Sequence, residues 1–199
     1  MAKISACIVA YCDYEEVCAA VRSILHYTQT ADFVLYVVDN ASPDGCGRQL
    51  AETDFGDDRV QILCLPENLG FGKGHNFVLD KLHSDVHFIL NPDILLTQDT
   101  LPAMADWLLA TPGAAMATPQ LHYPDGKLQH LPRRKPTPWL LLARQLAPRF
   151  GGVFRKADDH YTMQDEDLTQ PRKIEFCTGS FMAVRTEVYK KIGGLTPNI

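Results

Sequence analysis

The repeated order of apolar runs, polar turns and helical patterns limits the fold of this chain more than any other feature. Four short runs are apolar and rich in β-branched residues, as in strands buried on both faces: 5–11, 33–38, 60–65 and 86–90. Apolar residues recur at helical spacing after the first run and predict a helix over 14–27. Strands that alternate with helices in this way predict an α/β domain, with a mainly parallel central sheet flanked by helices.

Capping and turn residues set the expected limits of further elements. Asp13 is expected to cap the 14–27 helix, with Glu16 three residues later as a capping-box variant. Glycines at 70, 72 and 74 predict a turn that leads into a helix over about 75–83. Four more elements are predicted in the second half: a helix over 98–110, a strand over 116–121, a last strand over 176–185, and a short helix that Thr186 caps and Gly193-Gly194 closes.

Length and charge narrow the class of protein. The chain has 199 residues, of which 46% are hydrophobic and 22% charged, and this suits one domain with its own core. The formal net charge of −5 is uneven, because residues 127–156 hold eight Lys and Arg and no Asp or Glu, which leaves −13 on the rest. We therefore expect a single domain over 1–199 with a basic, proline-rich insertion or loop at 127–157. Such a distribution argues against a nucleic-acid partner and favours a local anionic one.

The sequence shows neither a targeting signal nor a membrane span. One Lys and a short apolar run precede Asp13, Glu15 and Glu16, a start too short and too acidic for a signal peptide. No apolar run approaches the ~20 residues that cross a bilayer, so we expect a cytoplasmic protein. The six cysteines form no C-x-x-C pair, and we expect buried, reduced thiols instead of metal ligands or disulfides.

Polar residues directly follow the predicted strands, and in parallel sheets ligands bind beyond the carboxyl ends of the strands. Asn91-Pro92-Asp93 can face one Mn²⁺ or Mg²⁺ ion with two oxygen-bearing side chains, of which Asp93 is the stronger ligand. The alternative for this tripeptide is a plain turn. Asp39 can accept hydrogen bonds from a ribose or a base, or it can cap the turn that follows. Tyr11 can stack on a base, or it can pack at the rim.

The segment Gly70-Phe71-Gly72-Lys73-Gly74 carries a weaker signal. It lacks the G-x-G-x-x-G spacing and follows the third strand instead of the first, so a nicotinamide-dependent oxidoreductase is a poor alternative. Its glycines can still bring the backbone close to a phosphate, and Lys73 can add a positive charge. The sequence has no G-x-S-x-G elbow, H-E-x-x-H or P-loop.

Six segments occur in one order along the chain: Ile8-Val9-Ala10-Tyr11, Val37-Val38-Asp39-Asn40-Ala41-Ser42-Pro43-Asp44-Gly45, Glu67-Asn68-Leu69-Gly70-Phe71-Gly72-Lys73-Gly74-His75-Asn76, Leu90-Asn91-Pro92-Asp93, Pro124-Asp125-Gly126, and Thr178-Gly179-Ser180 with the helix end from Glu187 to Leu195. Together they resemble family 2 glycosyltransferases of the GT-A fold, a Rossmann-like nucleotide-diphospho-sugar transferase fold. The resemblance is greatest to the rhamnosyltransferase-like branch, and it covers essentially the whole chain.

The resemblance implies an inverting transfer of a sugar from a nucleoside-diphosphate donor to a hydroxyl of a glycan or a lipid-linked acceptor. The pathway it implies is the synthesis of cell-surface polysaccharide or glycolipid. Asn91 and Asp93 match the element that holds Mn²⁺ or Mg²⁺, which neutralises the departing diphosphate. Tyr11 and Asp39 match residues at the base and ribose. The residues expected to bind the nucleotide sugar are Ala10, Tyr11, Asp39, Asn68, Gly72, Lys73, Asn76 and Asn91.

Two departures from the family pattern bear on activity. The usual Thr-Tyr-Asn after the first strand is Ala10-Tyr11-Cys12 here, which weakens any polar contact by the third position. The family's Glu-Asp base element normally follows the Gly-Gly that matches Gly193-Gly194, and residues 195–199 hold no carboxylate side chain. We therefore assign no catalytic base and expect a domain that is incomplete at its C-terminus. The alternative to an active enzyme is a module that binds nucleotide sugar without transferring it.

The basic segment has two interpretations. Trp139-Leu140-Leu141-Leu142 is an apolar stretch among five cations, a mixture that suits an anionic membrane surface: Arg133, Arg134, Lys135, Arg144 and Arg149. The first interpretation therefore predicts a peripheral contact with the inner face of the cytoplasmic membrane. The second is a mobile basic loop near the donor diphosphate or the acceptor.

Overall fold

The computed structural model describes residues 2–129, 132–135, 137–140, 145 and 152–196. The chain divides into two compact units. The first unit combines Met1–Ala117 with Gly179–Ile199, and the second unit is Thr118–Thr178. The first unit is therefore built from two separate parts of the sequence, and the second unit is the continuous segment between them.

A six-stranded sheet with the order β3-β2-β1-β4-β8-β5 forms the centre of the first unit. Its first four strands are parallel: β1 (Ile4–Ala10), β2 (Phe33–Asp39), β3 (Val60–Cys64) and β4 (Val86–Leu90). Two strands run antiparallel to their neighbours, β8 (Phe181–Arg185) beside β4 and β5 (Met116–Ala117) beside β8. This topology confirms the predicted α/β class with a mainly parallel sheet.

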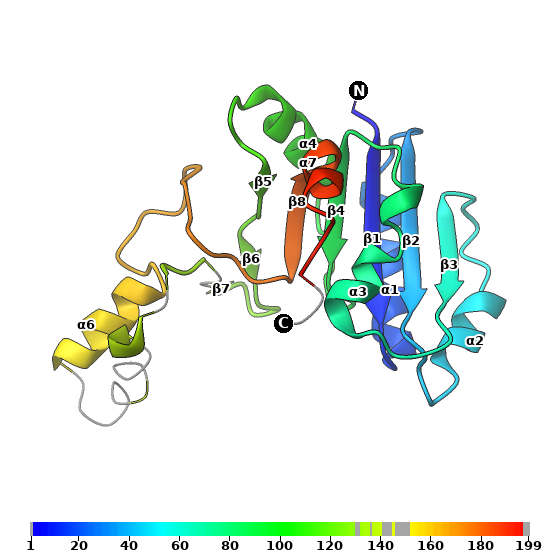
Figure 1. Ribbon diagram of the computed structural model, residues 1–199, viewed down its shortest axis with the longest axis horizontal. Helices are drawn as coiled ribbons and strands as arrows, with labels where there is room; N and C mark the ends of the chain where they lie inside the picture. The colour runs from blue at the N-terminus through cyan, green and yellow to red at the C-terminus, as the bar shows by residue number, and fades with distance from the viewer. Residues whose placement is uncertain (1, 130–131, 136, 141–144, 146–151, 197–199) are drawn as a thin grey trace. The chain divides into compact units, whose positions relative to one another are not determined.

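Helices cover both faces of this sheet (Figure 1). They are α1 (Tyr14–Tyr27), α2 (Cys46–Glu52), α3 (Gly70–Asn76), the 3₁₀ helix η1 (Leu79–Lys81), α4 (Thr100–Ala110) and α7 (Thr186–Lys191). Because the sheet is covered on both sides, β1 and β4 are buried at every residue, as their apolar sequences predict. Burial of each aliphatic side chain in these strands contributes about 1.5–3 kcal/mol to the free energy of folding.

The predicted helix over 14–27 is confirmed with Asp13 as its N-cap residue, but the predicted side-chain cap does not form. Asp13 has a φ of 61°, in the left-handed region, and its side chain makes no hydrogen bond to the helix. Cys12 has a φ of 65°, so the chain turns sharply over two residues between β1 and α1. A capping side chain needs an extended backbone at its own residue, and this turn does not provide one.

The predicted turn at the glycines and helix over 75–83 are also wrong, because α3 runs through the glycines and ends at Asn76. A Cβ atom at Gly74 would lie 2.9 Å from Cγ1 of Val9, and one at Gly72 would lie 3.0 Å from the carbonyl oxygen of Thr196. The missing side chains thus let the helix approach β1 and the segment after α7. Close packing outweighs the low helix propensity of glycine.

Two predicted strands prove shorter. The strand expected over 116–121 is limited to β5, and that expected over 176–185 begins only at Phe181. Residues 118–121 and 176–178 belong to the second unit, where Phe176 forms a bridge with Arg133. Thr186 is the first residue of α7 instead of its cap; its buried hydroxyl lies 3.0 Å from that of Ser84.

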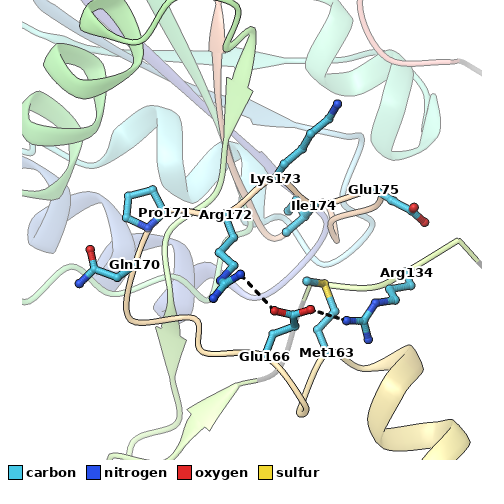
Figure 2. A pocket seen from close by; sticks show the side chains of 9 residues that line it. All are labelled: Arg134, Met163, Glu166, Gln170, Pro171, Arg172, Lys173, Ile174 and Glu175. Atoms are coloured by element: carbon cyan, nitrogen blue, oxygen red, sulfur yellow. Dashed lines mark hydrogen bonds and ion pairs between the residues drawn. The ribbon is translucent and has the colours of Figure 1, made fainter.

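The second unit contains the short hairpin of β6 (Leu121–His122) and β7 (Leu128–Gln129), followed by α6 (Gly152–Tyr161). Arg134 donates to Asp165 and to Glu166 at 2.7 Å each, and Arg172 lies 3.3 Å from the other oxygen of Glu166. Figure 2 shows Glu166 between the two guanidinium groups. They border a pocket of about 490 Å³ lined by Arg134, Met163, Glu166, Gln170, Pro171, Arg172, Lys173, Ile174 and Glu175. None of the predicted donor-binding residues lines it.

Part of the predicted basic surface lies outside the described residues, namely Leu141, Leu142, Arg144 and Arg149. Trp139 is described and is 53% exposed. Among the described helices, none has the length and apolar character needed to cross a bilayer.

Arg185 at the end of β8 joins the sheet to the end of α4, which yields a test of the fold. Its guanidinium donates to the carbonyl oxygens of Leu108, Leu109, Thr111 and Ala114 at 2.7–3.3 Å. The last carbonyls of a helix lack the usual N–H partner four residues on, and a cation also suits the helix C-terminus. We expect Arg185→Met to lower the free energy of unfolding by about 2 kcal/mol in urea denaturation.

Arg48→Met is the matched control, because the Arg48 side chain is 83% exposed and pairs with Glu52 one turn away. It should change stability by no more than about 0.5 kcal/mol. Equal losses in the two variants would show that Arg185 does not fasten α4.

Candidate functional site

The carboxyl ends of β1, β2 and β4 meet at one edge of the sheet. Ala10 lies opposite Asp39 in the register of β1 with β2, and Ile8 lies opposite Leu90 in the register of β1 with β4. Tyr11 and Asn91 follow their strands directly, so both begin at this edge. The arrowheads of β1, β2 and β4 point to the same edge in Figure 1, with α3 beside it. Open parallel sheets bind ligands at this position.

Asp39 and Asn40 point to opposite faces of the sheet although they are adjacent in sequence. A Cβ atom at Gly47 would lie 2.3 Å from Oδ2 of Asp39, so the Asp39 carboxylate packs on α2. Asn40 Oδ1 accepts a hydrogen bond at 2.8 Å from the backbone N–H of Leu69, immediately before α3. Neighbouring strand residues alternate between the two faces of a sheet. The end of β2 therefore contacts α2 on one face through Asp39 and the loop before α3 on the other face through Asn40.

The Asp39 carboxylate organises the turn that follows β2. Ser42 donates to it twice, from its hydroxyl and, at 3.2 Å, from its backbone N–H. The Ser42 hydroxyl oxygen also accepts from the backbone N–H of Cys12 at 2.8 Å, which joins the turn after β1 to the turn after β2. These described contacts are those of a turn cap, one of the two alternatives for Asp39, and a role at the ribose or base stays a prediction.

Sequence reasoning missed Ser42 and the strained backbone around it. Ala41 has a φ of 59°, and Cys12 and Asp13 lie in the same left-handed region. Non-glycine residues in this region cost about 1–3 kcal/mol each and gather at functional sites. The only signal in the sequence was the density of turn residues after Asp39, which does not indicate a sign of φ.

Asn40 and Asn68 fasten the loop that leads into α3. Asn40 Nδ2 donates to Oδ1 of Asn68 at 2.9 Å, and the same oxygen accepts from the backbone N–H of Gly70 at 2.9 Å. Asn68 was predicted to bind the donor, and the structure places it at the strand-end edge with its carbonyl oxygen holding this loop. Asn40, which is 3% exposed, was not predicted.

The side-chain amide of Asn76, at the other end of α3, makes three hydrogen bonds. Its Oδ1 accepts from the Tyr189 hydroxyl at 2.9 Å and from the Leu195 N–H at 2.8 Å, and its Nδ2 donates to the Leu195 carbonyl at 2.8 Å. A Cβ atom at Gly194 would lie 2.2 Å from Oδ1 of Asn76. This amide therefore fastens the glycine turn after α7, and its predicted contact with the donor stays a prediction.

Four other predicted residues make no polar side-chain contact with the described part of the chain. Ala10 is buried, and its carbonyl oxygen accepts from the backbone N–H of Asn40 at 2.9 Å. Gly72 is half-buried against Thr196. Tyr11 is 48% exposed at the end of β1, and Lys73 is exposed on α3. An exposed aromatic ring and an exposed cation are both accessible to a ligand at this edge.

Asn91 and Asp93 provide the oxygen ligands of the predicted metal site. The backbone N–H of Asn91 donates to the carbonyl oxygen of Ser180 at 2.9 Å, and Asp93 is exposed. Within the described part of the chain, no cluster of three His, Cys, Asp or Glu residues could hold a metal. One carboxylate and one amide fit only an ion whose remaining ligands are water and phosphate oxygens. Mg²⁺ is usually coordinated in this way at substrate phosphates.

Three thiols surround the Asp39 carboxylate. Burial and the charges of Asp39 and Asp44 raise the pKa of Cys46 to about 11, and the pKa values of Cys12 and Cys64 are raised by burial and by nearby carboxylates. They therefore stay protonated at neutral pH and are weak nucleophiles. All six cysteines are free, and Cys7, Cys18 and Cys46 are buried as predicted. The prediction of burial is wrong for Cys64, which is exposed, while Cys12 and Cys177 are half-buried.

Two histidines, His75 of α3 and His87 of β4, are buried and neutral. Burial lowers the pKa of His75 and of His87 to about 3. His87 contacts the Ser5 hydroxyl through Nδ1 at 2.8 Å and stacks on Tyr189, while both ring nitrogens of His75 have no partner among the described groups. The two imidazoles are therefore uncharged at neutral pH.

A family model described as glycosyl transferase family 2 matches residues 5–193, nearly the full chain. The chain belongs to glycosyltransferase family 2. This membership confirms the family named by the strand-end motifs and leaves the rhamnosyltransferase-like branch as a prediction.

One solved structure confirms the GT-A fold of this family 2 chain. The mannosyltransferase PcManGT from Pyrobaculum calidifontis, solved with GDP-Man and Mn²⁺, matches with a TM-score of 0.64 and 16% identity over 100% of this chain and 49% of that chain. TarS from S. aureus, solved with UDP, matches 53% of this chain and 32% of that chain at 21% identity, and its TM-score of 0.48 is too low to support an argument.

A curated relative is much longer than this chain. The uncharacterized protein y4gI from Sinorhizobium fredii is 29% identical over 114 residues, which are 56% of this chain and 12% of that protein. The family 2 chain thus spans about an eighth of this relative and about half of PcManGT.

The two buried histidines make stability depend on pH. Their folded-state pKa values lie below the ordinary value of 6.5, so folding favours their neutral forms. The free energy of unfolding is therefore highest above pH 6.5 and falls as the pH decreases towards 3. The reason is that these histidines bind protons at a higher pH in the unfolded chain than in the folded one. We expect His75→Leu to reduce the loss of unfolding free energy between pH 7.5 and pH 5.0 in urea denaturation.

His83→Leu serves as the control because His83 is exposed. It should leave the difference between the two pH values unchanged. A wild-type chain as stable at pH 5.0 as at pH 7.5 would contradict the burial of neutral imidazoles.

Proposed function

We propose that the strand-end edge of the first unit binds a nucleoside-diphosphate sugar and that the chain takes part in transferring the sugar to an acceptor hydroxyl. The observation that carries this proposal is the register that sets Ala10 opposite Asp39, with Tyr11 and Asn91 following strands that end at the same edge. Membership of glycosyltransferase family 2 supports the same chemistry. Tyr11 would stack on the base, and Asp39 would accept hydrogen bonds from the base or ribose.

Asn91 and Asp93 would hold a Mn²⁺ or Mg²⁺ ion against the donor diphosphate. Such an ion stabilises negative charge on the departing diphosphate. The neighbour PcManGT was solved with GDP-Man and Mn²⁺, which supports this choice of ion and ligand. Lys73 would add a positive charge to the same anion, and Asn68 and Asn76 would keep the α3 region in place beside it.

The finer features of the reaction are also part of the proposal. Transfer would be inverting, and the acceptor would be a glycan or a lipid-linked sugar in the synthesis of cell-surface polysaccharide or glycolipid. A cytoplasmic site at the inner face of the membrane suits such an acceptor. The exposed Trp139 beside the basic residues of 127–157 supports a peripheral contact with anionic lipid.

Donor binding tests the proposed function directly. Isothermal titration of the chain with UDP-GlcNAc, GDP-mannose and dTDP-rhamnose, in Mn²⁺ and in EDTA, should show metal-dependent binding of at least one of them. Asp93→Asn should weaken this binding at least about tenfold, because it removes the charged metal ligand. Asp39→Ala should weaken it in both Mn²⁺ and EDTA, because Asp39 contacts the nucleoside and not the metal.

Asp106→Asn is the matched control, since Asp106 is an exposed carboxylate on α4. It should bind the donor as the wild-type chain does. If none of the three donors binds, the proposed function is wrong. Binding without release of sugar in a turnover assay would favour a binding module over an enzyme.

Flotation with lipid vesicles tests the membrane contact. We expect the chain to float with vesicles containing 30% anionic lipid at low salt and to remain at the bottom with purely zwitterionic vesicles, because basic residues attract anionic headgroups. Trp139→Ser should reduce the floating fraction by removing an exposed apolar anchor. Trp107→Ser, at a 41% exposed residue of α4, is the control. No flotation at low salt would rule out this contact.

A further inference from the structure

Phe71 is an exposed aromatic residue whose ring is held in place from two sides. It belongs to the first turn of α3 and is 41% exposed. Its ring packs edge-on against the buried ring of His75, with 4.5 Å between the centroids. A Cβ atom at Gly179 would lie 3.2 Å from both Cε1 and Cζ of Phe71, so the ring also rests on the bare backbone of that glycine. A large apolar surface is thus fixed and left open.

The contact with Gly179 places Phe71 close to the proposed metal ligands. Gly179 precedes Ser180, whose carbonyl oxygen accepts from the backbone N–H of Asn91 at 2.9 Å. On its other side, Phe71 follows the loop that Asn40 and Asn68 fasten. The ring is therefore next to the loop that Asn40 and Asn68 fasten, and it is close to the residues that precede Asp93.

The chemistry of this position differs from that of its neighbours. Phosphate oxygens prefer Lys73 and a metal at Asn91 and Asp93, and Tyr11 is the aromatic residue at the end of β1. Phe71 offers no polar atom, so it suits the part of the ligand that presents C–H groups. In a nucleoside-diphosphate sugar, the face of the sugar ring is such a part, and burying it on an aromatic ring removes apolar area from water.

We propose that Phe71, seated on Gly179, is the apolar platform for the sugar ring of the donor and a specificity-determining residue of the site. This inference rests on the proposed function and deepens it. The aromatic ring selects sugars with a continuous C–H face, and Gly179 sets the height of the ring. A side chain at residue 179 would force the ring to move by a few tenths of an ångström, because 3.2 Å is tighter than nine in ten Cβ contacts.

The test compares a nucleoside diphosphate with its own sugar conjugate, since only the conjugate reaches the platform. The chain is titrated in Mn²⁺ with GDP and GDP-mannose and, in parallel, with UDP and UDP-GlcNAc and with dTDP and dTDP-rhamnose. We expect Phe71→Ala to weaken binding of the sugar conjugate about fivefold to tenfold and to leave binding of the nucleoside diphosphate within about twofold. Phe77→Ala is the matched control, because Phe77 is 44% exposed directly after α3.

Gly179→Ala supplies a second, independent measurement. It should weaken binding of the sugar conjugate in the wild-type background and have no further effect in the Phe71→Ala background, since the two residues act through one contact. Circular dichroism of each variant checks that the fold is kept.

The outcomes separate this inference from the proposed function. If wild-type chain binds neither nucleoside diphosphates nor their sugar conjugates, the proposed function fails and the platform fails with it. If Phe71→Ala weakens both ligands equally, or weakens neither, nucleotide binding stands and the platform alone is overturned. Additive effects of Phe71→Ala and Gly179→Ala would also overturn it.

Discussion

The parallel pairing of β1 with both β2 and β4 is the constraint on which the site depends. It sets Ala10 level with Asp39 and brings the end of β4 to the same edge, so residues from three distant parts of the chain begin their turns together. Side chains of β1 that point to one face meet α3, and those that point to the other share a face with Asp39. A shift of one residue in this register would exchange these faces and separate the loops.

The strands and the family were predictable because their signals are local. Fully apolar runs ended by polar turns indicate buried parallel strands, and the motifs after them suffice to name the family. The helix through Gly70, Gly72 and Gly74 was not predictable, because glycine lowers helix propensity and only the contact with Val9 reverses this. Likewise, nothing local reveals that Phe176 pairs with Arg133 instead of extending β8.

The site was predicted in outline and missed in its supporting residues. Asp39, Asn68 and Asn91 reach the expected edge, but Ser42 and Asn40 hold the turns there through hydrogen bonds between segments far apart in the sequence. Such partners follow from the folded register and not from spacing along the chain. The left-handed residues Cys12, Asp13 and Ala41 carry no side-chain signature of their conformation, so their strain is visible only in the folded chain.

The amide of Asn76 has a mechanical consequence. It grips the backbone at Leu195, 119 residues away in sequence, through one donor and one acceptor, and Gly72 rests on the carbonyl of Thr196. These contacts join α3 to the segment that follows α7. We therefore expect a ligand that displaces α3 to displace the backbone at Leu195 as well, without any change in the sheet.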